Sequence, residues 1–102
     1  MANIELDGTN KKIKVDSGDL TLDVPGDTIL DADGANITFK DGGTSILDIS
    51  NSSSDAVITS SVQDKDIIFK GDDNGSAITA LTLDMSEAGA ATFNSAITVV
   101  DF

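Results

Sequence analysis

Glycine recurs at every eighth position of the stretch GDLTLDVPGDTILDADGANITFKDGG, at Gly18, Gly26, Gly34 and Gly42. Asn10 lies eight residues before the first of them, and asparagine tolerates a positive φ better than most residues other than glycine. Turns at this spacing leave room for only a five- or six-residue strand between them. We therefore expect octad repeats over about residues 10–43, with at least two of these glycines at positive φ. On this basis Gly26→Val should cost about 1 kcal/mol or more.

Short strands are predicted along the whole chain. Besides the octads LTLDVPG and TILDADG, segments such as KIKVDSG, NITFKDGG, TSILDIS and DIIFKG carry two or three apolar residues and end in turn residues. Strands at this spacing, punctuated by turns, indicate an all-β architecture. Only Asp84–Ala91 has helical character, and its length predicts one helical turn or a loop. We interpret residues 1–102 as a single repetitive β domain.

A longer repeat aligns about residues 37–50 with about residues 67–86. In both copies a Phe-Lys pair is followed by a related tetrapeptide, LDIS in the first and LDMS in the second. The second copy carries six extra residues, mostly in GDDNGS, which predicts a longer loop. The polar stretch NSSSDA lies between the copies and is expected to be a hinge. Self-similarity of this kind is typical of solenoids and fibrous arrays.

The charge and the missing residue types exclude several functions. The net charge is −12, and the only basic residues are six lysines, so neither nucleic acid nor an anionic membrane is an expected partner. The chain has no His or Cys, which removes the usual base and nucleophile of enzymes and the preferred ligands of zinc. We therefore expect no enzymatic activity. The first residues contain no apolar run of the kind found in a signal peptide.

Calcium is the metal to weigh, because it binds carboxylate and carbonyl oxygens. The stretches DADGAN and GDDNG are acidic but do not fit the twelve-residue calcium loop pattern. Aspartate pairs such as Asp31 with Asp33, Asp64 with Asp66, and Asp72 with Asp73 could in principle form a catalytic carboxylate dyad. Aspartate is common in turns, so we expect these residues to be solvated turn residues. No cofactor is assigned, and structural calcium stays an open alternative.

Each predicted strand has one apolar face. We expect ten residues to face the interior of an assembly: Leu20, Leu22, Leu30, Ile37, Phe39, Ile67, Phe69, Leu81, Leu83 and Phe93. By strand alternation, their neighbours Thr21, Thr38, Ile68 and Thr82 should point the other way, and Ile68 requires either cover on both faces or a bulge. One layer of such strands cannot bury its apolar face, whereas three copies around an axis can, and closure also pairs strand edges.

Three stretches, GDLTLDVPGDTILDADGANITFKDGG, DKDIIFKG and ALTLDMSEAGAATFN, resemble the repeat shafts of marine bacteriophage tail fibres and related virion proteins. The similarity spans about residues 3–97. It implies an intertwined homotrimeric β-helix or β-prism shaft that spaces a host-binding tip from the virion, with other virion proteins as further partners. It also implies a virion location after synthesis in the host cytoplasm. The alternative is a single-chain β-solenoid or sandwich adhesin-type binding module whose GDDNGS loop holds calcium or glycan.

Overall fold

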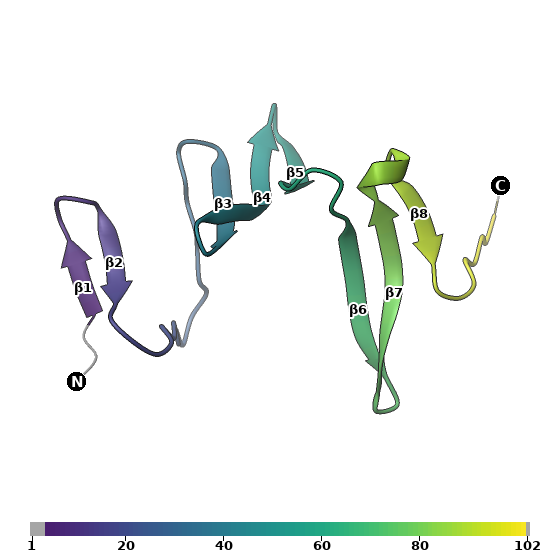
Figure 1. Ribbon diagram of the computed structural model, residues 1–102, viewed down its shortest axis with the longest axis horizontal. Helices are drawn as coiled ribbons and strands as arrows, with labels where there is room; N and C mark the ends of the chain where they lie inside the picture. Colours follow the sequence, from purple (N-terminus) through teal and green to yellow (C-terminus); the bar gives the residue numbers. More distant parts are fainter. Residues whose placement is uncertain (1–3, 102) are drawn as a thin grey trace.

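The chain is all-β, and its strands follow one another as a series of hairpins (Figure 1). The computed structural model describes residues 4–101. A single short 3₁₀ helix occurs within these residues, in the segment for which the sequence predicts one helical turn or a loop. The elements are β1 (Ile4–Asp7), β2 (Lys12–Val15), β3 (Asn36–Asp41), β4 (Thr44–Ser52), β5 (Asp55–Ser60), β6 (Ile67–Asp73), β7 (Ser76–Asp84), η1 (Met85–Glu87) and β8 (Ala90–Phe93).

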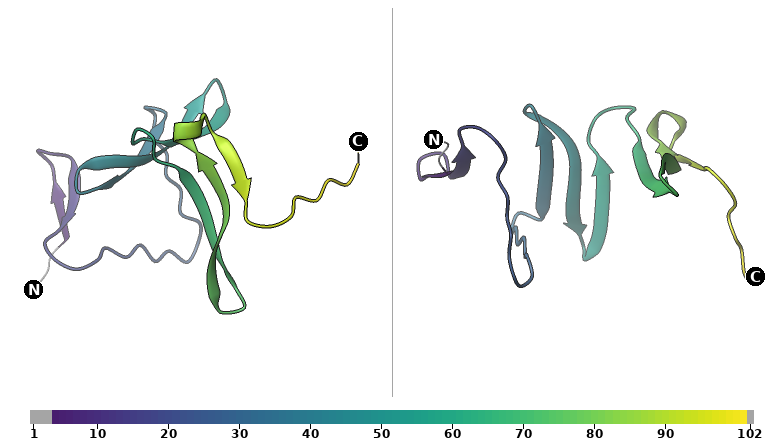
Figure 2. Two further views of the ribbon diagram at one scale, coloured as in Figure 1. Left: turned by 45° about the vertical axis from the view of Figure 1, so that its right-hand side comes forward. Right: turned by 90° about the horizontal axis from the view of Figure 1, so that it is seen from below.

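The strands form separate antiparallel sheets. Their orders are β1-β2, β3-β4-β5 and β6-β7-β8, so each sheet contains only strands that are consecutive in the sequence. The sheets lie one after another along the molecule (Figures 1 and 2), which measures 54 × 39 × 31 Å and has a radius of gyration of 18.4 Å. A compact domain of this length has a radius of gyration of about 13 Å. None of the described side chains is fully buried, so these residues form no hydrophobic core within one chain.

The two three-stranded sheets repeat the same local structure. Phe39 of β3 pairs with Leu47 of β4, and Phe69 of β6 pairs with Leu81 of β7. In each sheet the register shifts immediately after the phenylalanine, which is the mark of a β-bulge. The longer repeat seen in the sequence therefore corresponds to a repeated three-stranded unit with its bulge at the same place.

The bulged residue accepts an equivalent backbone hydrogen bond in both sheets. Lys40 pairs with Ser45, so Ile46 has no partner in β3. The Ile46 carbonyl accepts a hydrogen bond from Ser61 N–H at 2.9 Å. In the other sheet the Ala80 carbonyl accepts from Asn94 N–H at 3.0 Å. Each bulge thus fixes the residue that follows the third strand of its sheet.

The second unit differs from the first by a longer ladder and not by a longer loop. Its hairpin has two additional pairs, Gly71 with Ile78 and Asp72 with Ala77, while the turn beyond them has two residues as in the first unit. The expectation of a long GDDNGS loop is therefore wrong. Because Leu47 and Leu81 are the residues opposite the phenylalanines, strand pairing aligns Leu47 with Leu81 instead of Leu83.

Three hairpins close through two-residue turns in which both central residues have positive φ. These are Gly42-Gly43 (55° and 89°), Asn74-Gly75 (53° and 89°) and Ser53-Ser54 (51° and 75°). This is the type I′ pattern, whose twist matches that of antiparallel strands. The third turn lies in the NSSSDA stretch, so the expected hinge is instead a hairpin between β4 and β5. Ser54 N–H donates to Asn51 Oδ1 at 2.8 Å, which supports this turn without glycine.

The octad glycines are only partly turn residues of the expected kind. Gly18 has a φ of 76° and Gly42 has a φ of 55°, which confirms that at least two of the four glycines are at positive φ. Gly26 and Gly34 are not among the residues with positive φ, and next to the latter it is Ala35, at 75°, that has this conformation. The strain argument for Gly26→Val is therefore wrong, because this glycine is not in the left-handed region.

The first hairpin also turns one residue later than expected. Asp7 pairs with Lys12, and the residue with positive φ in the intervening loop is Lys11 at 58°, whereas Asn10 is not in this conformation. The Lys11 ammonium donates to the Gly8 carbonyl at 2.8 Å. This contact across the loop helps to hold a side chain other than glycine in a conformation that it rarely adopts.

Two of the predicted octad strands do not form in the single chain. Residues 19–32 contain no strand, and residues 17–31 make no hydrogen bond that the structure describes. A strand is defined by a neighbour that accepts and donates its backbone hydrogen bonds, and the chain places no such neighbour here. Pro25 adds a second reason, since proline lacks the N–H donor that a ladder requires. The segment is therefore unpaired, with a bend at Pro25-Gly26.

A matched pair of glycine variants tests these backbone assignments. Gly43→Val should lower the free energy of unfolding by about 1–2 kcal/mol, because a β-branched residue is strained at a φ of 89°. Gly26→Val should lack this cost. Neither position has an atom within 4 Å of an added Cβ, so steric overlap does not separate the two variants. Urea denaturation measures the difference, and equal losses would contradict the assignment.

Candidate interaction surface

One face of the β3-β4-β5 sheet is apolar. Cross-strand partners lie on the same face of a sheet, and every second residue along a strand returns to it. The register therefore gathers six residues on one face, in two rows: Ile37, Ile49 and Ile58, then Phe39, Leu47 and Ser60. The opposite face carries the row Thr38, Asp48 and Thr59, in which the threonine Oγ1 of the first donates to the carboxylate of the second.

The β6-β7-β8 sheet repeats this division. Its apolar face has the rows Ile67, Leu83 and Ala91, then Phe69, Leu81 and Phe93. Thr82 pairs with Ile68 on the opposite face, as strand alternation predicts. A bulge follows Phe69, but it does not bring Ile68 to the apolar face, and 52% of this residue stays exposed.

Residues 4–101 supply no layer that covers either apolar face. Phe39 is 46% exposed, Phe69 is 50% exposed and Phe93 is 44% exposed. Of the other residues predicted to face an interior, Leu20, Leu22 and Leu30 are exposed, and Ile37, Ile67, Leu81 and Leu83 are half-buried. Large apolar patches on a protein surface mark sites of interaction. The burial of these ten residues in an assembly stays a prediction.

A groove of about 270 Å³ lies at the junction of the two three-stranded sheets. Its apolar walls come from Ile46 and Leu47 of β4, from Val62 in the connection, and from Ile67 of β6. Ser60, Lys65 and Asp66 complete its lining. The sequence reasoning did not identify Ile46, Val62 or the groove itself.

Two side-chain hydrogen bonds fix the connection that forms one wall of this groove. Ser60 Oγ donates to the Lys65 carbonyl at 2.7 Å, and Asp66 Oδ1 accepts from Met85 N–H at 3.1 Å. The first contact ties the end of β5 to the end of the connection, and the second ties the start of β6 to η1. The groove is therefore lined by a constrained segment between two strands.

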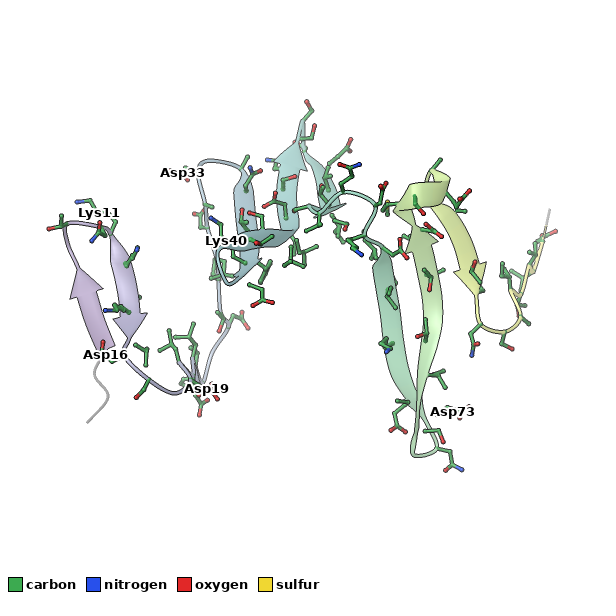
Figure 3. All side chains as sticks on the ribbon, in the orientation of Figure 1. Lys11, Asp16, Asp19, Asp33, Lys40 and Asp73 are labelled. Carbon is green, nitrogen blue, oxygen red and sulfur yellow. The ribbon has the colours of Figure 1, made fainter. Side chains whose placement is uncertain are left out.

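Charged side chains are spread over all three sheets of the described chain (Figure 3). Lys11, Asp19, Lys40 and Asp73 lie in separate parts of the molecule (Figure 3). Among the described residues, no group of three or more acidic side chains could hold a metal ion. At the tip of the β6–β7 hairpin, Asp72 Oδ1 accepts from Gly75 N–H at 2.7 Å, so this carboxylate supports its own turn. No helix among residues 4–101 is long and apolar enough to cross a membrane.

Comparison with protein-family models, with curated proteins and with solved structures finds no match to this chain. The apolar faces and the groove are thus the features on which a function must be argued. Part of these faces could be predicted from the sequence, since Leu47 and Ile49 alternate with polar residues in the same way as Ile37 and Phe39. The groove could not be predicted, because it depends on the path of the connection between the sheets.

Proposed function

We propose that this chain is a structural module of a phage tail fibre or a related virion appendage. It acts as part of a homotrimeric shaft that spaces a host-binding tip from the particle. The observation that supports this proposal most strongly is the pair of apolar sheet faces that a single copy leaves uncovered. The resemblance of the octad and Phe-Lys stretches to fibre shafts supports it independently.

Three copies around a common axis offer a simple way to cover these faces. Each chain presents its apolar rows on one side of a sheet and its Thr and Asp rows on the other, as in Thr38 and Asp48. Turning the apolar rows of three chains toward one axis removes them from water and leaves the polar rows outside. Repetition of the three-stranded unit along the chain would extend such an arrangement lengthwise, as a shaft requires.

The oligomeric mass tests this proposal. A sizing column with light scattering should give three times the 10.5 kDa mass of one chain, with the early elution of an elongated particle. A folded species of 10.5 kDa that persists at high concentration would contradict the shaft. That result would favour the single-chain binding module, for which a calcium-dependent rise in melting temperature is the next measurement.

A further inference from the structure

Residues 19–24 form no strand in the single chain, although their side chains alternate as those of a strand do. They follow Gly18 in extended form and make no hydrogen bond that the structure describes. Leu20, Leu22 and Val24 alternate along them and are 44%, 67% and 47% exposed. Backbone donors and acceptors that become buried in an assembly must be paired. A segment with apolar side chains at every second residue and a free backbone has the properties of a strand that adds to another sheet.

The groove at the sheet junction offers such a segment a place to bind. It lies beside Ser60 at the end of β5 and Ile67 at the start of β6, and each of these strands is an edge strand of its own sheet. Each therefore has one side without a strand neighbour. The groove volume of about 270 Å³ exceeds the ~150 Å³ that accommodates a benzene ring in an apolar cavity. It is open to side chains of leucine size.

We propose that residues 19–24 of one copy bind as a strand in this groove of a second copy of the chain. This inference rests on the proposed function, because it requires an assembly. In the proposed contact, Leu20, Leu22 and Val24 enter the apolar groove while the backbone pairs with the free edge of β5 or β6. Pro25 follows directly and cannot donate to a ladder, so the pairing ends there.

The position of the segment in one chain favours a second copy over the same copy. In one chain the segment precedes β3, at one edge of its sheet, whereas the connection of residues 61–66, which lines the groove, follows β5 at the other edge (Figure 1). Strand addition of this kind obtains affinity from backbone hydrogen bonds and specificity from alternate side chains.

Disulfide trapping tests the contact directly, because the chain has no cysteine of its own. The test variant combines Leu22→Cys with Val62→Cys, and mild oxidation should link each chain to the next. A closed ring of three links gives a covalent trimer, at three times the 10.5 kDa mass of one chain, on a denaturing gel. The matched control combines Ile97→Cys with Val62→Cys, since Ile97 is 62% exposed and Leu22 is 67% exposed. The control should stay at the mass of one chain.

Amide hydrogen exchange on the unmodified protein gives a second measurement that does not depend on a substitution. In the assembly, the alternate amides of residues 19–24 that pair with the groove should exchange at least about 100-fold more slowly than in a dissociated chain. A trimeric assembly in which Leu22 and Val62 do not crosslink would overturn the groove assignment and leave the shaft standing, whether or not these amides are protected. A crosslink within one chain would also overturn it. A chain that is monomeric throughout would overturn the shaft itself.

Discussion

The melting temperature of the assembled chain should rise with protomer concentration. Unfolding of a trimer is also its dissociation, so mass action favours the folded state as concentration increases. A tenfold increase adds about 2.8 kcal/mol per trimer, because two association steps each gain about 1.4 kcal/mol. With an unfolding entropy of ~2.1 cal/mol/K per residue, the expected shift is roughly 4 °C.

Salt should raise the melting temperature of the same assembly. Three chains carry 3 × (−12) = −36 charges, and their mutual repulsion opposes association. At physiological ionic strength, salt largely screens the repulsion between exposed charges that lie more than about 8 Å apart. Differential scanning fluorimetry over a matrix of protein and salt concentrations measures both effects. A melting temperature that is independent of protein concentration would show that the monomer folds alone, and would contradict the proposed assembly.

Substitution of Leu81 by aspartate should abolish the assembly. Leu81 lies in the central strand of its sheet, in the apolar row between Phe69 and Phe93. If this row is buried between copies, the loss of an apolar side chain there costs at least about 2–5 kcal/mol per copy. The introduced carboxylate adds a desolvation cost, since a buried charge without a partner is strongly unfavourable. The expected result is a loss of the trimeric species in light scattering.

The adjacent substitution Thr82→Asp is the matched control. It introduces the same charge into the same strand, but on the face where Thr82 pairs with Ile68 and Thr92. This face is expected to stay in contact with water, so the control should keep the mass of the unmodified protein. If Leu81→Asp assembled normally while Thr82→Asp did not, the inward and outward faces would have to be exchanged.

The sequence was most informative where structure depends on neighbours that are close along the chain. Alternation placed Ile37 and Phe39 on one face and Thr38 on the other, and the register agrees. Most predicted strands also formed, since each has a hairpin partner only a turn away. Element order and facing follow from local pattern in this chain because every sheet is a simple meander.

The errors have a different physical origin. The octad strands over residues 19–32 carry the correct alternation, but a strand also needs a partner, and alternation does not say whether one is present in the same chain. The sequence predicts a hinge around Ser53-Ser54 because this stretch is the most polar part of the chain. Both serines instead have a positive φ, a conformation that residues other than glycine seldom adopt. The hydrogen bond from Ser54 N–H to Asn51 Oδ1, which helps to support the turn, depends on side-chain geometry that composition does not reveal.

The connections between the sheets have a mechanical consequence. Each junction between two sheets is a single connecting segment without a β-strand, residues 16–35 in one case and residues 61–66 in the other. No β-ladder among the described residues crosses either junction. Tension applied along the long axis of one chain would therefore straighten these connections before it loaded any backbone ladder. A fibre built from such chains must carry load through contacts between copies. Its stiffness would then depend on how well the sheets of neighbouring chains are held across the junctions.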